Sequence, residues 1–158
     1  MKNINRHLIL LFTLSLALVI PMLSGCSPAK DPAQEVLDTN RAKWEQAAIA
    51  SYDFQLRIGC FCPPDNTRPV DIEVEDGVAI SIEYTDEPKT VTTDFFQRAD
   101  TIEKLFDIIQ DAINTEADSL LVEYDATYGH PTSITIDPIK LAVDEEIAYF
   151  VEAFAPKA

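Results

Sequence analysis

Two hydrophobic periodicities alternate along this chain, and their order constrains the fold more than any other feature. A stripe of apolar residues at helical spacing is followed by three segments in which apolar and polar residues alternate, and this order then repeats. The connections are short enough for successive strands to pair antiparallel. The sequence therefore predicts an α+β two-layer sandwich, in which helix-strand-strand-strand occurs twice and both helices cover one face of an antiparallel sheet.

The first predicted helix spans residues 32–49. Asp31 is its expected N-cap, Pro32 occupies the first helical position, and Gln34 completes a capping box. One helical face is mostly apolar and consists of Val36, Leu37, Asn40, Trp44, Ala47 and Ala48. We expect this face to pack on the sheet.

Three alternating strands follow, and the turn at Asp76-Gly77 joins the second strand to the third. A three-residue loop, 75–77, keeps the apolar faces in phase by pairing Val74 with Val78 and Ile72 with Ile80. The acidic residues Asp71, Glu73 and Glu75 then fall on the opposite face, which we expect to be solvated.

The second half repeats the pattern. A polar connector, 86–99, leads to a capping box at Asp100–Glu103 and a helix that ends near Glu116. Its buried stripe is predicted to contain Ile102, Leu105, Phe106, Ile109, Ala112 and Ile113. Two strands, around 120–126 and 132–136, form an in-phase hairpin, and a last strand covers about 145–154. We expect Trp44, Ile109 and Val122 to be buried.

The N-terminus carries a targeting signal. Lys2 and Arg6 precede an apolar stretch, Leu8–Ile20. This stretch is shorter than the roughly 20 residues that a membrane-spanning helix needs, which argues against a permanent N-terminal anchor. The sequence Leu23-Ser24-Gly25-Cys26 then resembles the lipobox of bacterial lipoproteins rather than a plain secretory signal.

This resemblance implies a division of the chain. Residues 1–25 would be a signal peptide, Cys26 would be lipidated at the start of a tether, 26–31, and residues 32–155 would form a single α+β domain. By the sorting convention of this class, Ser27 favours the outer membrane facing the periplasm. The expected partners are the membrane, through the lipid anchor, and an envelope protein.

The charge of the mature chain excludes some partners. Removal of Lys2 and Arg6 with the signal leaves 10 basic and 27 acidic residues, a formal net charge of −17. Nucleic acid and anionic lipid surfaces both need a basic patch, so neither is an expected electrostatic partner. We find no EF-hand loop, P-loop or dinucleotide fingerprint, and no cofactor is predicted.

Cys60 and Cys62 remain as a pair in an oxidising compartment once Cys26 is lipidated. In a regular strand, residues two apart stand roughly 6.5–7 Å apart, whereas disulfide Cβ atoms need about 3.5–4.5 Å. A structural disulfide therefore requires a bend between Gly59 and Pro63. Two buried free thiols on the first strand, or a thiol–disulfide exchange site, are the alternatives, although no basic residue stands beside the pair to lower a thiol pKa.

Metal binding by the same cysteines is a weaker alternative. A zinc site needs four ligands, and the mature chain offers His130 as its one histidine. No metal site is predicted.

The hairpin loop around His130 offers a second candidate site. We expect His130 to be exposed at the loop tip and Asp125, Tyr128, Gly129, His130 and Pro131 to form a contact surface. The alternative is that His130 acts as a general base, with Ser133 as nucleophile. No Gly-x-Ser-x-Gly elbow or triad spacing supports this, so no catalytic residue is predicted.

Several short motifs together resemble an uncharacterised family of small bacterial envelope lipoproteins, classed as a domain of unknown function. They lie within residues 44–154 and are Ser51-Tyr52-Asp53-Phe54, Cys60-Phe61-Cys62-Pro63, Val74-Glu75-Asp76-Gly77, Tyr124–Thr132 and Asp144-Glu145-Glu146. The resemblance implies an envelope address and a shared fold, but no activity. The expected function is a non-enzymatic binding or assembly module; the alternative is a thiol–disulfide or metal-handling protein that uses Cys60 and Cys62.

Overall fold

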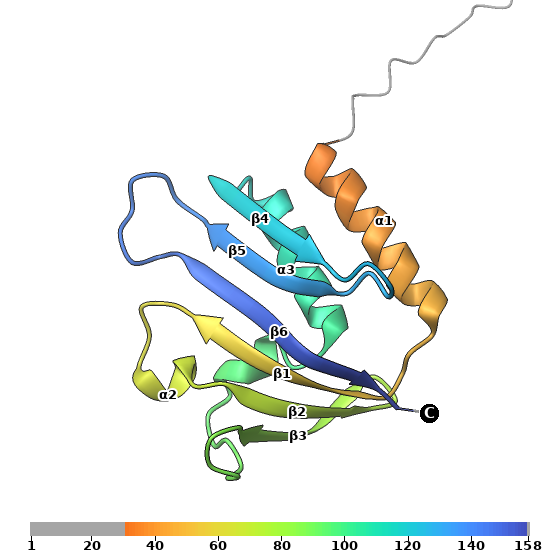
Figure 1. Cartoon of the computed structure of the whole chain (residues 1–158). Helices are drawn as coiled ribbons and strands as arrows, with labels where there is room; N and C mark the ends of the chain where they lie inside the picture. The colour runs from red at the N-terminus through yellow and green to blue at the C-terminus, as the bar shows by residue number, and fades with distance from the viewer. Residues whose placement is uncertain (1–30, 158) are drawn as a thin grey trace, which may run out of the picture.

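The structure is a computed structural model that describes residues 31–157. Its elements are α1 (Pro32–Ala47), β1 (Tyr52–Gly59), α2 (Pro64–Thr67), β2 (Val70–Glu75), β3 (Val78–Tyr84), η1 (Phe95–Arg98), α3 (Ile102–Asn114), β4 (Ser119–Tyr124), β5 (Pro131–Asp137) and β6 (Ile147–Pro156). The fold is α+β, as predicted. Its strands form one open antiparallel sheet in the order β3-β2-β1-β6-β5-β4 (Figure 1).

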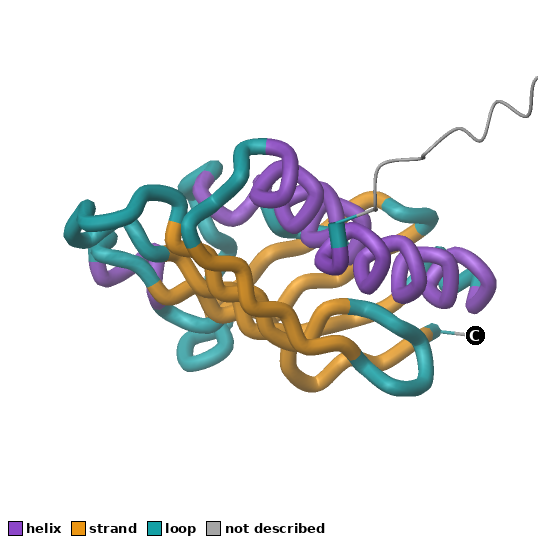
Figure 2. The backbone as a smooth tube through the Cα atoms, turned by 90° about the horizontal axis from the view of Figure 1, so that it is seen from above, coloured by secondary structure: helices purple, strands orange, loops and turns teal. Residues whose placement is uncertain are grey.

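The long helices α1 and α3 lie on the same face of the sheet (Figure 2). Alternate residues of the strands point toward them, which gives β1 its regular sequence of buried and less buried positions. The core between helices and sheet includes Leu37, Trp44, Tyr52, Leu56, Ile58, Ile72, Phe96, Leu105, Phe106, Ile109, Ile134 and Tyr149. Within residues 31–157, neither long helix covers the other sheet face (Figure 2).

The predicted repetition of a helix and three strands is not confirmed. The short helices α2 and η1 interrupt the order, and the strand order makes the two halves unequal. β1, which follows α1, lies next to the sheet centre, whereas β4, which follows α3, is an edge strand. The last strand, β6, lies between β1 and β5 and joins the halves.

The register predicted for the β2–β3 hairpin is wrong. Glu75 pairs with Val78 across a two-residue turn at Asp76-Gly77, where both residues have positive φ, 49° and 76°. Such a turn matches the twist of the strands better than the predicted loop. A bulge next to Val74 then restores the phase, so that Ile72 faces Ile82. The bulge leaves Val78 and Ile80 exposed.

Both capping boxes were predicted with the wrong partners. Asp31 does cap α1, since its carboxylate accepts a hydrogen bond from Ala33 N at 2.8 Å, but the Gln34 side chain bonds Gln110 on α3 instead of closing the box. The cap of α3 is Thr101, one residue later than predicted, and its hydroxyl accepts from Lys104 N. The Gln34 side chain thus bonds a distant residue, whereas the Asp100 carboxylate bonds Lys104 of the helix that it was expected to cap.

The core prediction is confirmed for Trp44 and Ile109 and is wrong for Val122, which is only half-buried. The β4–β5 hairpin is in phase as predicted, with Val122 opposite Ile134. β4 is nevertheless an edge strand, and a shallow apolar groove separates it from the start of α1. Pro32, Ala33, Val36, Ile109, Leu120, Leu121, Val122 and Tyr124 line this groove.

Candidate functional site

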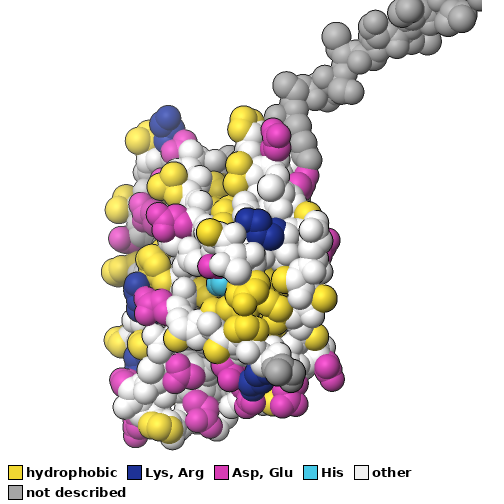
Figure 3. Space-filling model, turned by 45° about the vertical axis from the view of Figure 1, so that its right-hand side comes forward, with side chains coloured by type: hydrophobic (Ala, Val, Ile, Leu, Met, Phe, Trp, Pro, Cys, Tyr) yellow, Lys and Arg dark blue, Asp and Glu magenta, His cyan; other side chains and the backbone are white. Residues whose placement is uncertain are grey.

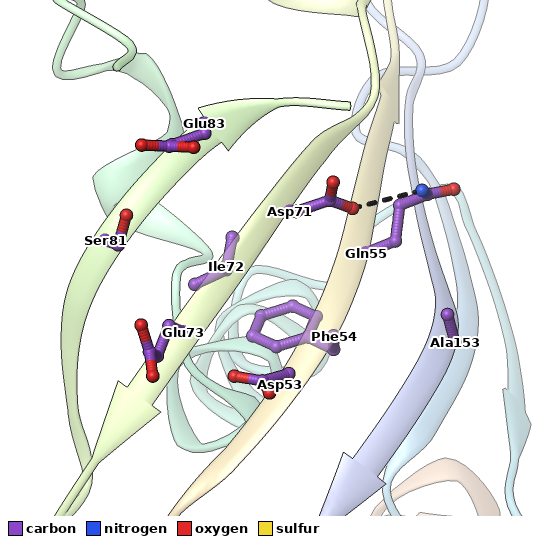
Figure 4. A pocket seen from close by; sticks show the side chains of 9 residues that line it. All are labelled: Asp53, Phe54, Gln55, Asp71, Ile72, Glu73, Ser81, Glu83 and Ala153. Atoms are coloured by element: carbon purple, nitrogen blue, oxygen red, sulfur yellow. Dashed lines mark hydrogen bonds between the residues drawn. The ribbon is translucent and has the colours of Figure 1, made fainter. Parts of the chain in front are cut away.

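The open face of the sheet carries a group of carboxylates. Asp53 on β1, Asp71 and Glu73 on β2, and Glu83 on β3 line a shallow pocket of about 340 Å³ together with Gln55, Ser81 and Ala153 (Figure 4). These side chains point away from the helices because alternate strand residues face opposite sides. The prediction that Asp71 and Glu73 lie on the face opposite the core is confirmed.

Most of these carboxylates already have partners. Lys157 Nζ lies 2.8 Å from Asp53 and also bonds Glu73, and these two contacts raise the pKa of the lysine. Asp71 accepts hydrogen bonds from Gln55 (the dashed line in Figure 4) and from the Thr85 hydroxyl. The surface is therefore acidic but internally bonded. Its remaining negative charge suits a cationic group on a partner.

The aromatic cluster is a second feature and consists of Trp44, Tyr52, Tyr128, His130 and Phe154. The His130 ring stacks on Phe154 with centroids 4.3 Å apart, and Trp44 packs edge-on against both Tyr52 and Phe154. Figure 3 shows the imidazole, the one cyan side chain, beside a patch of hydrophobic surface. The cluster connects α1, β1, the β4–β5 loop and the end of β6.

The prediction that His130 is exposed is wrong, since its exposed fraction is 4%. The β4–β5 loop folds back onto α1, where the Lys43 ammonium donates to Ala126 O at 3.1 Å. Gly129 has φ +80°, and a Cβ atom there would lie 2.5 Å from Asn40 O. Only a glycine allows this contact, so the loop packs closely enough on the helix to cover the imidazole.

Asp125 holds the loop in shape. Its carboxylate accepts hydrogen bonds from Thr127 N at 2.9 Å and Tyr128 N at 2.6 Å, which is a local turn motif of aspartate. Gly129 and Pro131 are buried, while Asp125 and Tyr128 are half-buried. The predicted contact surface is therefore mostly an internal packing surface, and only its Asp125–Tyr128 portion reaches solvent.

His130 is electrostatically unusual. Its Nδ1 is buried without a hydrogen-bond partner within residues 31–157 and lies 3.9 Å from Asp125 Oδ1, which is too long for a hydrogen bond. Burial lowers the pKa of the imidazole, and the nearby carboxylate opposes that shift. These surroundings therefore favour the neutral imidazole. It cannot act on an external substrate without movement of Phe154 or the loop.

Glu103 joins three elements, a role that sequence reasoning missed. Its carboxylate accepts hydrogen bonds from Trp44 Nε1 at 2.9 Å and from the Tyr52 hydroxyl at 3.1 Å. The Tyr52 oxygen in turn accepts from Ile102 N at 2.8 Å. Burial is the main cause of the raised pKa of Tyr52. The available signal was that buried Trp and Tyr need polar partners.

Cys60 and Cys62 lie beyond β1, not on it, because the strand ends at Gly59. Their sulfur atoms are within bonding distance, with Cα atoms 5.2 Å apart, and both residues are half-buried. The bend expected between Gly59 and Pro63 is therefore present. Phe61, between them, is 82% exposed. The predicted position of the cysteines on a strand is wrong.

The cysteine pair and His130 cannot share a metal ion. His130 packs near Tyr52 at the start of β1, through Trp44 and Phe154, whereas the cysteines follow the end of that eight-residue strand. A strand of this length spans roughly 24 Å at about 3.4 Å per residue. Within residues 31–157, no group of three potential ligand residues is placed to hold a metal ion.

Cys26 and residues 27–30 of its expected tether lie outside the described residues. Among the helices that the structure describes, none has the length and apolar character needed to cross a membrane.

Comparisons with known proteins identify a family but no characterised relative. Residues 36–156 match a family of unknown function, DUF6174, somewhat beyond the 44–154 over which the motifs resemble an uncharacterised family. The comparisons with curated proteins and with solved structures gave no match. Since the matched segment spans most of the 158 residues, the chain belongs to the DUF6174 family.

Proposed function

We propose that this chain is a lipid-anchored protein of the bacterial cell envelope that binds a protein partner or supports envelope assembly. The observation that carries the proposal is the sequence Leu23-Ser24-Gly25-Cys26 behind a short basic and apolar stretch. Lipidation of Cys26 adds acyl chains at ~0.8 kcal/mol per buried CH₂, so two or three chains give stable anchoring. Ser27 favours the outer membrane facing the periplasm.

The open sheet face is the contact surface that we assign to the partner. Asp53, Asp71, Glu73 and Glu83 give it a negative charge, with Lys157 as the cation bound among them. A partner with a basic surface would gain both orientation and a faster encounter from this charge. The buried position of His130 supports a non-enzymatic role, because the imidazole lies behind Phe154.

The anchor is tested by Cys26→Ser in the full chain. We expect the variant to lose lipid labelling and to accumulate as uncleaved precursor, with Ser24→Ala as a control that keeps both processing and labelling. A Cys26→Ser chain that still partitions into detergent at mature length would contradict the proposal.

The contact surface is tested by site-specific photo-crosslinking in cells. A crosslinker in place of Ser81, on the open face, should give an adduct of defined mass with an envelope protein. A crosslinker in place of Asp107, which is exposed on α3 beside Arg41 of α1, is the matched control and should give none. Equal adducts at both positions, or no adduct at Ser81, would contradict the assignment.

The second candidate function is thiol–disulfide exchange by Cys60 and Cys62. It is supported by their sulfur atoms lying within bonding distance in a loop whose central residue, Phe61, is exposed. Thiol counting on the mature protein, with and without reductant, tests whether the pair cycles. A Cys62→Ala variant should trap a mixed disulfide through Cys60 if exchange occurs, and Cys60→Ala should not if Cys60 is the attacking thiol.

A further inference from the structure

We propose that the β5–β6 loop, residues 138–146, inserts Ile139, Leu141 and Val143 into the lipid bilayer that holds the N-terminal anchor. This inference rests on the proposed lipidation of Cys26. It adds an orientation to that function: one end of the domain lies on the membrane, and the open sheet face is left free for a partner.

The loop exposes an unusual amount of apolar surface. The exposed fractions of Ile139, Leu141 and Val143 are 55%, 92% and 79%, all within five consecutive residues. Leu141 also has φ +66°, a backbone conformation that leucine rarely adopts. Exposed aliphatic side chains are ordinary when they are scattered, but a contiguous group typically marks a site of protein or membrane contact.

The loop lies at the end of the sheet where α1 begins. Pro32, the first residue of α1, lines the same groove as Leu120 on β4. Leu120 pairs with Ile136 on β5, and Ile136 pairs with Ile147 on β6, so these positions bracket the loop. Figure 1 shows the start of α1 and the β5–β6 loop toward the same end of the sheet. We call it the anchor end.

The exposed apolar residues of the domain are concentrated toward this anchor end. The large hydrophobic residues exposed within residues 31–157 are Val36, Phe61, Val78, Ile80, Leu121, Ile139, Leu141 and Val143. Val78 and Ile80 lie at or near the β2–β3 turn, at the opposite end of the strands. The others belong to the β5–β6 loop, the cysteine loop after β1, the first half of α1 and the first half of β4.

A short tether holds the anchor end close to the bilayer. Asp31, the N-cap of α1, is the fifth residue after Cys26. Even fully extended, five residues span at most about 17 Å, at roughly 3.5 Å each. The acyl chains on Cys26 would therefore keep the start of α1 near the headgroups, and the neighbouring loop would face the same surface.

The chemistry of the loop favours apolar insertion over electrostatic attraction. Lys140 lies among the three aliphatic residues, 4.0 Å from Asp118, and a long lysine side chain can reach the headgroup region while its stem stays apolar. Asp144-Glu145-Glu146 follow directly and are exposed. These acids would repel anionic lipid, so insertion should depend on apolar contact and change little with salt.

The test places a solvent-sensitive fluorophore on the full lipidated protein in vesicles. Leu141→Cys is labelled with the fluorophore without reductant, and the unsubstituted chain is labelled in parallel to measure reaction at Cys60 and Cys62. Val78→Cys, an exposed aliphatic position at the opposite end, is the matched control. Phosphatidylcholine vesicles, with and without brominated acyl chains, are compared at low and high salt.

We expect a blue shift at position 141, quenching by the brominated chains, and no change with salt, while position 78 stays in a polar environment. An unshifted spectrum at position 141 would overturn the inference. A blue shift without quenching of the emission by brominated lipid would also overturn it, because it would indicate contact with protein instead of lipid. A shift lost at high salt would overturn apolar insertion. Lipid labelling of the same samples separates this failure from failure of the anchor itself.

Discussion

The hydroxyl oxygen of Tyr52 on β1 accepts a hydrogen bond from the backbone N–H of Ile102, the first residue of α3, at 2.8 Å. A side chain from a central strand thus satisfies a helix N-terminal donor that has no partner within its own helix. The same hydroxyl donates to Glu103, which also holds Trp44. One phenol therefore fixes the start of α3 relative to the sheet and to α1.

Tyr52→Phe should lower the free energy of unfolding by about 1–3 kcal/mol, because it leaves the buried Ile102 N–H without a partner and removes one bond to Glu103. Tyr149→Phe is the matched control. Tyr149 is equally buried, but its hydroxyl makes no hydrogen bond within residues 31–157, so the change should cost under 1 kcal/mol. Urea denaturation measures both; equal losses would show that the Tyr52 bond adds nothing.

Gly129→Ala should destabilise the chain more than Gly77→Ala. Both glycines have positive φ, +80° and +76°, so both substitutions carry a similar backbone cost of roughly 1–2 kcal/mol. At Gly77 no atom lies within 4 Å of a new Cβ, whereas at Gly129 it would meet Asn40 O at 2.5 Å. We expect the two losses in free energy of unfolding to differ by about 1–3 kcal/mol, and this difference measures the packing of the β4–β5 loop on α1.

Thermal unfolding of the two glycine variants gives the comparison. Increased quenching of Trp44 fluorescence by acrylamide in the Gly129 variant alone would show that the loop has lifted from the helix. Equal unfolding temperatures would contradict the close approach between loop and helix.

Ile109→Ala should cost about 2–5 kcal/mol, because Ile109 is 1% exposed and lies on the buried face of α3. Ile139→Ala is the control, since that side chain is mostly exposed, and should fall within about ±0.5 kcal/mol. A small effect at Ile109 would mean that α3 does not pack on the sheet through this face.

The predictions that succeeded depend on residues close together in sequence. The alternation of apolar and polar residues predicted the strands, and Asp31 and Pro32 predicted the start of α1. The apolar residues of β4 and β5, such as Leu120 and Ile136, both alternate in the same phase, which predicted the β4–β5 pairing. Each depends on local backbone geometry, which the residue pattern expresses directly. The helical stripe of α3 succeeded for the same reason, and Ile109 lies in the core as that stripe required.

Some of the predictions that failed depend on contacts between distant residues, whereas the β2–β3 register failed on the local geometry of its two-residue turn. His130 was expected in solvent because its hairpin loop was considered alone, yet Asn40 and Lys43 lie far earlier in the chain and cover that loop. Glu103 looked like half of a capping box, whereas it bonds Trp44 and Tyr52. No local pattern predicts which helix will lie over which loop, and none predicts that β6 lies between β1 and β5.

Replacement of both Cys60 and Cys62 by Ala should lower stability by less than the ~3 kcal/mol expected for a 15-residue loop, because the pair closes a minimal ring. Since the pair lies outside the sheet, the far-UV spectrum should not change. Chemical denaturation of the oxidised chain, the reduced chain and the double variant provides the measurement. Full stability with a lost redox phenotype in cells would favour the exchange function over the structural one.

The stability of the fold should depend on pH through His130. Burial lowers the pKa of its imidazole below the ordinary 6.5, so the folded chain binds the proton less readily than the unfolded chain. The contribution of this group to the free energy of unfolding is therefore complete above about pH 6.5 and decreases as the pH falls toward the folded pKa. His130→Gln, which does not titrate, should remove this dependence between pH 7 and 5.

Asp125→Asn tests the electrostatic part of the argument. The carboxylate of Asp125 opposes the lowered pKa of His130, while an amide oxygen can still accept the bonds from Thr127 N and Tyr128 N. We expect this variant to lose stability more steeply than the parent chain as the pH falls, because its imidazolium would have no nearby negative charge. NMR titration of the imidazole and urea denaturation across the same pH range measure the two effects. A pKa of His130 at or above 6.5 in the folded parent chain would show that burial does not outweigh the nearby Asp125 carboxylate, and the expected loss of stability at low pH would then be absent.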